Sequence, residues 1–269
     1  MSDVDEDALA VAYEAALALE KSGPVGDAVR AWQAVLALDP ADPGGASIRL
    51  AALGVGKLPD KAPPAYVATL FDQHAEVFDG ILVDQLEYGV PMLLRERFQA
   101  LHVGPFARML DLGCGTGLAG EALEDMVEHF TGVDLAEGMI EIAGEKDLYD
   151  RLFIADAIGF MEEAAESWDL IVATDVLPYV GDAASLFKAA RARAAGRGWL
   201  AFSTETLSSD ALNGRDWAVT THHRFAHDAD YIYKALHKTG FEVADFRDIM
   251  VRREQGNPIM GHLFICRAA

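Results

Sequence analysis

The stretch Met109-Leu-Asp-Leu-Gly-Cys-Gly-Thr-Gly-Leu-Ala-Gly120 decides the fold. Its first residues are typical of a buried strand, its glycines of a tight turn, and the residues after the turn of a helix. Glycines allow the backbone to approach a ligand closely, because they carry no Cβ atom. The first turn of a helix also leaves backbone N–H groups free. The stretch therefore predicts a strand, a ligand-binding turn and a helix in succession.

The spacing Gly115-x-Gly117-x-x-Gly120 also matches the dinucleotide-binding pattern, which is a weak signal by itself. Three features argue against a nicotinamide dinucleotide. Asp111 ends the strand, where a carboxylate opposes a pyrophosphate but suits an ammonium group. Asp134 ends the next predicted strand, about twenty residues on, where it can hold ribose hydroxyls. The end of the chain indicates a reversed strand, which an all-parallel dinucleotide fold lacks.

Short apolar runs alternate with amphipathic helices after residue 107, which predicts a parallel sheet flanked by helices. The expected strands cover residues 107–112, 130–134, 152–154, 169–174 and 198–203. Residues 241–252 and 259–267 are two further β-rich runs, joined by a connection that is too short for a crossover helix. We therefore expect an antiparallel hairpin at the end of the sheet.

The first part of the chain has helical patterns only. Gly23 and Pro24 separate two amphipathic helices, and Pro40 follows the second one. This segment resembles a tetratricopeptide unit, with Trp32 at the aromatic position, although a plain helical hairpin packed on the main domain explains the pattern as well. A proline cluster near residue 60 separates a helical segment, residues 1–60, from the main domain, residues 61–269. Two more helices are expected at 65–79 and 89–101.

Composition excludes several classes of protein. The 269 residues contain 22 Lys and Arg against 43 Asp and Glu, a formal net charge of −21. Binding to nucleic acid or to an anionic membrane is therefore disfavoured, because both need clustered cations. Two cysteines are too few for a disulfide framework. The acidic start of the chain has no signal-peptide pattern, and no apolar run is long enough to span a bilayer. We expect a cytoplasmic protein.

The motif from Asp111 to Gly117, followed by Asp134, resembles the first two motifs of class I S-adenosylmethionine-dependent methyltransferases. The resemblance extends from about residue 65 to the end of the chain. Within this class, the chain is most similar to bacterial methyltransferases with an N-terminal tetratricopeptide-like segment. Residues 70–79, 133–139, 148–150 and 224–227 carry it. It implies an α/β, Rossmann-like sheet, mostly parallel, that binds S-adenosylmethionine.

The resemblance implies a set of cofactor-binding residues, and for several of them a structural role is the alternative. Asp111 would orient the amino group of the cofactor beside the glycine turn, Asp134 would bind the ribose, and Asp156 would bind the adenine or cap the helix after it. The other expected contacts, some of which are equally typical of a packed core, are Phe71, Phe78, Gly113, Cys114, Gly115, Leu135, Met139, Ala157 and Thr174.

Three residues are candidates for removing a proton from the methyl acceptor: His227, Asp175 and Tyr179. His227 belongs to the segment 203–230, which is too long for a simple connection and is expected to form part of the acceptor pocket. His222, His223 and His227 do not have the spacing of a zinc site, so no metal is expected.

Methyl transfer from a sulfonium is an in-line displacement that depends mainly on the positioning of donor and acceptor. The low Lys and Arg content favours a small-molecule acceptor, with a protein acceptor as the other choice. The N-terminal helices are expected to mediate binding to a partner or to a second copy of the chain. The alternatives are a non-catalytic module that binds S-adenosylmethionine or a partner, and an NAD(P)-dependent oxidoreductase, which the reversed strand opposes.

Overall fold

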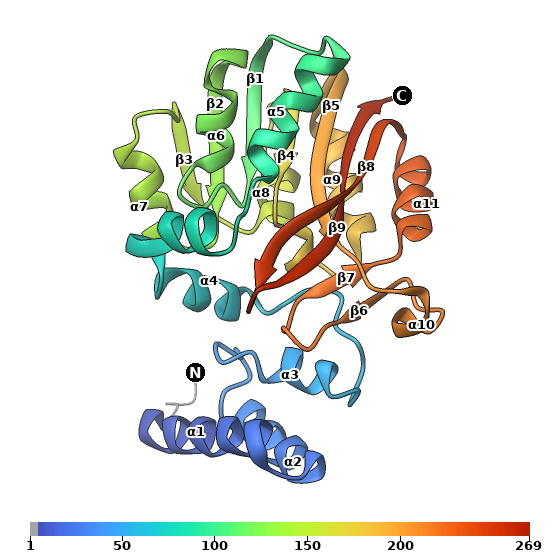
Figure 1. The fold of residues 1–269 in the computed structure, drawn as a ribbon. Coiled ribbons are helices and arrows are strands. Elements are labelled where there is room, and N and C mark those ends of the chain that lie inside the picture. Colours follow the sequence, from blue (N-terminus) through green and yellow to red (C-terminus); the bar gives the residue numbers. More distant parts are fainter. Residues whose placement is uncertain (1–4) are drawn as a thin grey trace.

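The computed structural model describes residues 5–269 and contains the expected α/β fold (Figure 1). Residues 1–4 lie outside the described residues. They belong to the acidic start of the chain, from which no signal peptide is predicted. The central sheet has the strand order β3-β2-β1-β4-β5, and all four of these pairs are parallel. The strands are β1 (Phe106–Leu112), β2 (Val127–Asp134), β3 (Arg151–Ile154), β4 (Trp168–Ala173) and β5 (Ala194–Glu205).

The last two strands form the expected antiparallel hairpin, and the fold class is confirmed. β8 (Phe241–Glu254) pairs with β9 (Asn257–Ala268), which lies antiparallel to β5. A second, smaller hairpin continues the sheet beyond the carboxyl end of β5. It consists of β6 (Trp217–Val219) and β7 (Phe225–His227), and it joins β5 through the pair Glu205 and Ala226.

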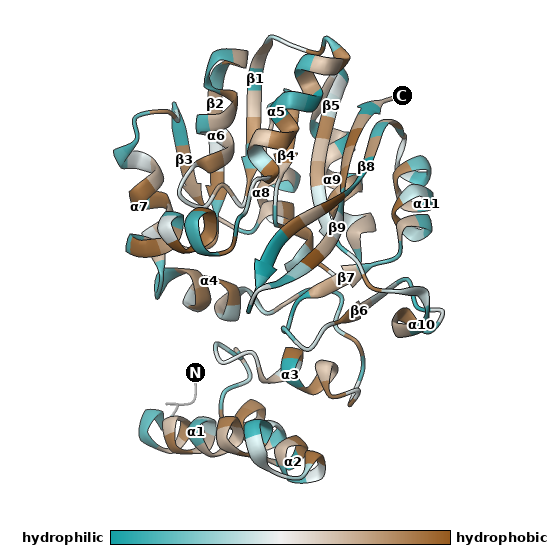
Figure 2. Ribbon diagram, in the orientation of Figure 1, coloured by the Kyte–Doolittle hydropathy of each residue, from teal (hydrophilic) through white to brown (hydrophobic). Residues whose placement is uncertain are grey.

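Helices cover both faces of the sheet, whose strands carry hydrophobic residues interspersed with polar ones (Figure 2). One face packs on α8 (Ala157–Glu163), α9 (Ala183–Arg193) and α11 (Ala229–Thr239) through a cluster that includes Phe187 and Phe202. The other face packs on α5 (Val90–Leu101) and α6 (Leu118–Leu123), with Phe98 fully buried. Each buried side chain of this size contributes roughly 1.5–3 kcal/mol, so the two layers fix the sheet that positions the site.

The N-terminal helices form a small cluster of their own. α1 (Glu6–Ser22) and α2 (Val25–Leu38) are the two expected helices, and α3 (Ala46–Ala52) packs against α2 around Trp32, which is fully buried. Asp5 caps α1 by accepting a hydrogen bond from the amide of Ala8. The likeness to a tetratricopeptide unit stays a prediction. No helix within residues 5–269 is long and apolar enough to cross a membrane.

Two predicted elements differ in extent from the observed ones. α4 (Pro64–Asp72) ends before the expected residue 79, and a short 3-10 turn and a π-helix, Gly80–Gln85, follow it. The segment 203–230 contains β6, β7 and α10 (Ser209–Leu212), and it is therefore not an irregular loop. The remaining helix, α7 (Glu137–Glu145), follows β2 and contacts β2 and β3.

Candidate functional site

A cleft of about 1030 Å³, its open mouth included, lies at the carboxyl ends of the parallel strands β1, β2 and β4. This is the edge at which open α/β sheets bind ligands. Most of the residues expected at the site line this cleft: Phe71, Phe78, Gly113, Cys114, Gly115, Asp134, Leu135, Asp156, Ala157, Thr174, Asp175 and Tyr179. Asp111, Met139 and His227 do not line it.

The glycine turn after β1 needs its glycines at two positions for different reasons. Gly113 has φ 60°, and a Cβ atom there would lie 2.6 Å from Cγ2 of Val176. Gly115 has φ 54°, and a Cβ atom there would project into open space beside Phe78, with its nearest neighbour at 3.9 Å. A side chain at Gly115 would thus occupy the cleft itself.

Asp134 is oriented by the backbone around it. One carboxylate oxygen accepts the amide hydrogen of Gly115 at 2.9 Å, and the other accepts that of Ala136 at 2.9 Å. Burial raises the pKa of Asp134, and these amide hydrogen bonds oppose the rise. Each carboxylate oxygen has a second lone pair, so the side chain can still accept hydrogen bonds from a ligand in the cleft.

Asp111 lies at the end of β1 but outside the lining of the cleft. The hydroxyl of Tyr149 donates a hydrogen bond to Oδ2 at 2.6 Å, whereas the buried Oδ1 has no hydrogen-bond partner among the described residues. Burial raises the pKa of Asp111 to about 7. Asp111 is therefore not among the lining residues, which a ligand in the cleft would contact directly, contrary to the expectation from the sequence.

Asp156 caps the helix after it, and it also lies at the cleft, where the expected adenine contact stays a prediction. Its Oδ1 caps α8 by accepting the amide hydrogen of Gly159 at 3.0 Å, and its Oδ2 accepts from Nζ of Lys61 at 3.0 Å while the residue lines the cleft. Met139, in contrast, is fully buried in a core cluster with Ala75 and Ala136. For Met139 the structure favours the packing role.

Aromatic rings close the cleft on the side of α4. Phe71 and Phe78 meet edge to face with ring centroids 5.7 Å apart, and Phe71 also contacts Tyr179 at 5.4 Å. Both phenylalanines line the cleft and also belong to apolar clusters. Asp79, just after Phe78, accepts hydrogen bonds from Thr116 and Lys146 and so fixes this segment to the glycine turn.

Arg224 organises the side of the cleft at the end of β4. Its guanidinium donates to Oδ1 of Asp175 at 2.6 Å and to the hydroxyl of Tyr179 at 2.8 Å, and it lies 2.7 Å from Glu205. Burial raises the pKa of Tyr179, so this hydroxyl keeps its proton. Oδ2 of Asp175 has no hydrogen bond to another group within the described part of the chain.

His227 is not in the cleft, which corrects its expected position. Its ring is fully buried, and Nε2 lies 2.9 Å from the carbonyl oxygen of Val180 and 3.0 Å from that of Gly181. Because carbonyls only accept, Nε2 carries the hydrogen. Burial lowers the pKa of His227 to about 4. The imidazole therefore fixes the loop after β4, and it does not line the cleft.

The segment 203–230 likewise contributes no residue to the described lining. It supports lining residues from outside the cleft: Arg224 contacts Asp175 and Tyr179, Ser203 Oγ accepts the amide hydrogen of Asp175 at 2.9 Å, and His227 contacts Val180. His222 pairs with Glu254 and His223 with Glu20, so these histidines do not converge with His227. From residue 5 to residue 269, no group of three His, Cys, Asp or Glu side chains is arranged to hold a metal ion.

Several lining residues have no signal in the sequence. Lys61 belongs to the proline cluster whose pattern predicts a linker, yet it forms a β-bridge with Val180. The amide of Ala62 donates to the carbonyl of Tyr179 at 2.9 Å, so the linker runs along the cleft. Tyr88, just before α5, is buried at the cleft, and burial raises its pKa. Hydrophobic periodicity does not distinguish this position from an ordinary core residue.

Comparison with known proteins agrees with this geometry. The sequence model of a family described as "Methyltransferase domain" matches residues 84–245. The ubiquinone biosynthesis O-methyltransferase of Bordetella pertussis is 30% identical over 161 residues, which cover 56% of this chain and 67% of the relative. The enzyme of that name from Paracidovorax citrulli is 32% identical over 112 residues, 39% of this chain and 46% of the relative. The chain thus spans about half to two thirds of these relatives.

Solved structures share the fold at low sequence identity. A S-adenosylmethionine-dependent methyltransferase from Clostridium acetobutylicum has a TM-score of 0.56 at 18% identity, covering 74% of this chain and 99% of that one. The N-methyltransferase NodS from Bradyrhizobium japonicum, in complex with S-adenosylhomocysteine, has a TM-score of 0.51 at 17% identity, covering 66% and 85%. The family model, which matches residues 84–245, identifies a methyltransferase domain, and the fold agrees with this assignment. The chain belongs to the methyltransferase domain family and is an S-adenosylmethionine-dependent methyltransferase.

Proposed function

We propose that this enzyme methylates a hydroxyl group of a small molecule, with Asp175 and Tyr179 facing the acceptor. The observation that carries the proposal is the state of Asp175, which lines the cleft. Arg224 donates a hydrogen bond to its Oδ1, and no side chain or amide of residues 5–269 donates a hydrogen bond to its Oδ2. The name of the relatives, ubiquinone biosynthesis O-methyltransferase, supports an oxygen acceptor.

The donor side of the cleft fits S-adenosylmethionine. The space beside Gly115, which a Cβ atom would enter, suits a ligand that contacts the backbone, and the oriented carboxylate of Asp134 suits ribose hydroxyls. Asp156 would bind the adenine, while Leu135 and Ala157 would pack on it. Gly113, Cys114 and Thr174 would border the methionine part of the cofactor. Asp111 does not line the cleft, and its buried, unpaired Oδ1 would be the atom that orients the amino group of the cofactor. When bound, the cofactor supplies a methyl group on a positively charged sulfur.

The chain's own residues then position the acceptor. Phe71 and Phe78 would present aromatic faces to the cation and exclude water from it. Oδ2 of Asp175 would accept the hydrogen of the acceptor hydroxyl and would take up the proton as the oxygen–methyl bond forms and the methyl–sulfur bond breaks, which leaves S-adenosylhomocysteine. The hydroxyl of Tyr179, which accepts from Arg224, keeps its own hydrogen for a bond to the substrate. Positioning of this kind is the main requirement of an in-line displacement.

Isotope transfer tests the proposal. The purified enzyme is incubated with S-adenosylmethionine labelled on its methyl group and either a panel of catechols and phenols or a panel of primary amines. Label in the phenols alone supports an oxygen acceptor, whereas label in the amines alone contradicts it. A parallel titration with S-adenosylhomocysteine and NADH checks the cofactor, and NADH is expected not to bind.

A further inference from the structure

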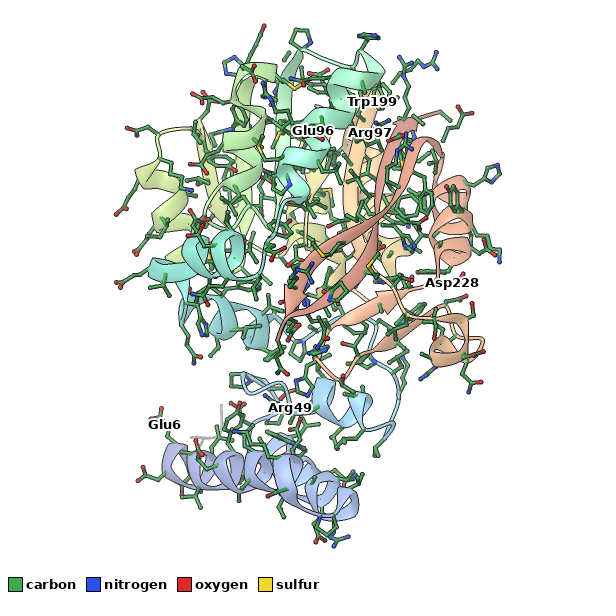
Figure 3. All side chains as sticks on the ribbon, in the orientation of Figure 1. Glu6, Arg49, Glu96, Arg97, Trp199 and Asp228 are labelled. Atoms are coloured by element: carbon green, nitrogen blue, oxygen red, sulfur yellow. The ribbon has the colours of Figure 1, made fainter. Side chains whose placement is uncertain are left out.

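Glu20, near the end of α1, joins the N-terminal helices to the catalytic domain. Its Oε2 accepts hydrogen bonds from Nε1 of Trp32 and Nη1 of Arg49, both at 2.9 Å. Its Oε1 lies 3.0 Å from Nε2 of His223, and since a carboxylate accepts, this nitrogen donates. The side chains of Glu20 and His223 are each only 19% exposed, so solvent screens this contact poorly. Figure 3 shows Arg49 on α3, above the α1–α2 pair.

His223 lies in the turn between β6 and β7 and directly precedes Arg224. Its backbone is left-handed, with φ 59°, and its amide donates to the carbonyl of Thr220 at 3.0 Å. Histidine is one of the residues that tolerate this conformation. The turn sends two successive side chains to different places: His223 to Glu20, and Arg224 to Asp175 and Tyr179.

Apolar contacts extend the same connection. Ile48 of α3 and Phe225 of β7 are both fully buried in one cluster, against which Tyr179 also packs. Figure 1 shows α3 between the α1–α2 pair and the β6–β7 hairpin. The hairpin that carries Arg224 is thus fixed on one side by the N-terminal helices and on the other by residues of the cleft.

We propose that the N-terminal helices position the acceptor side of the cleft, and that Glu20 and His223 are the positioning residues that act through Arg224. The inference rests on the proposed function in one respect: the proposed function assigns the side with Asp175 and Tyr179 to the acceptor. On the cofactor side, the polar contacts to Asp134 and to the glycine turn come from within residues 61–269. Loss of the contact should therefore affect the acceptor and leave the cofactor unaffected.

Full-length variants test this link. His223→Asn keeps a residue that adopts the left-handed backbone but is too short to reach Glu20, and it leaves the contacts of Glu20 with Trp32 and Arg49 intact. His223→Gln restores an N–H donor of similar reach. Arg30→Ala is the matched control, because it removes an exposed ion pair with Asp27 within α2. Four quantities are measured: amide hydrogen exchange of residues 175–182, the Kd of S-adenosylhomocysteine, and kcat and KM for a phenol that accepts label.

For His223→Asn we expect faster exchange at residues 175–182, an unchanged Kd, and a kcat/KM lower by about 10-fold to 100-fold, the scale of a small misplacement of reacting groups. His223→Gln should recover most of this loss, and Arg30→Ala should equal the wild type. Unchanged exchange in His223→Asn overturns the proposal, as does an equal weakening of S-adenosylhomocysteine binding. If no phenol accepts label, the proposed function fails, while hydrogen exchange still decides whether the helices hold the loop.

Discussion

The carboxylate of Asp134 accepts the amide hydrogen of Gly115 at 2.9 Å, so the end of β2 and the glycine turn after β1 are joined side by side at the cleft. The bond fixes the direction of the carboxylate and the conformation of the turn together. A side chain oriented in this way loses little conformational freedom when a ligand binds, which favours affinity. Substitution of either residue should therefore affect the binding of the cofactor.

Replacement of Asp134 by alanine should weaken binding of S-adenosylhomocysteine by about 1.5–3 kcal/mol, because hydrogen bonds to a charged group have that value. Isothermal titration calorimetry measures the loss. Glu128→Ala is the matched control, since Glu128 is an exposed acidic residue of the same strand. Equal affinities of Asp134→Ala and the wild type would exclude Asp134 from the cofactor site.

Replacement of Gly115 by alanine should abolish most of the cofactor binding, because the new Cβ atom enters the cleft. The left-handed backbone also costs roughly 1–2 kcal/mol for a residue other than glycine. Gly196→Ala separates the two effects: Gly196 has φ 48°, and a Cβ atom there would meet nothing within 4 Å, but it lies on β5 away from the cleft. Thermal denaturation should show a similar loss of stability in both variants, and calorimetry a loss of binding in Gly115→Ala alone.

Replacement of Asp175 by asparagine should lower turnover of the acceptor by about 10²–10⁴-fold if Oδ2 takes up the proton. Asparagine keeps the shape of the side chain and an oxygen for Arg224. Tyr179→Phe should have a smaller effect, because it removes one hydrogen bond of about 1 kcal/mol to the substrate. Both variants should keep the wild-type Kd for S-adenosylhomocysteine. Full turnover in Asp175→Asn would contradict the role given to this residue.

The glycine turn and the strand ends are predictable because they depend on local pattern. An apolar run followed by glycines specifies Gly113 and Gly115, and the parallel arrangement brings Asp134, Asp156 and Asp175 to one edge wherever the helices pack. The antiparallel hairpin follows from the short connection between residues 252 and 259. In each case neighbours in the sequence determine the outcome.

The acceptor side is not predictable in this way, because it depends on contacts between distant residues. Arg224 lies 49 positions from Asp175, and the pairing of the two becomes visible only in the structure. Lys61 belongs to a proline-rich segment that pattern alone assigns to a linker, while its β-bridge with Val180 crosses 119 positions in the chain. The sequence favours His227 as a base because free histidine titrates near neutral pH. Its complete burial, which removes that property, has no local signature.

His227 should also give the stability of the protein a dependence on pH. The unfolded chain binds a proton at this imidazole below its ordinary pKa of 6.5, whereas burial lowers the pKa in the folded protein to about 4. Above pH 6.5 the ring is neutral in both states, so it causes no pH dependence there. Between pH 6.5 and about 4 the unfolded state binds more protons, so the free energy of unfolding falls as the pH falls, by up to about 3 kcal/mol in total. Urea denaturation of the wild type and of His227→Gln across this range measures the difference. His227→Gln should lose the fall in the free energy of unfolding between pH 6.5 and about 4 that the ring causes. Parallel slopes in the two proteins would show that the buried ring titrates normally. If the variant still turns over the acceptor, His227 is not the base.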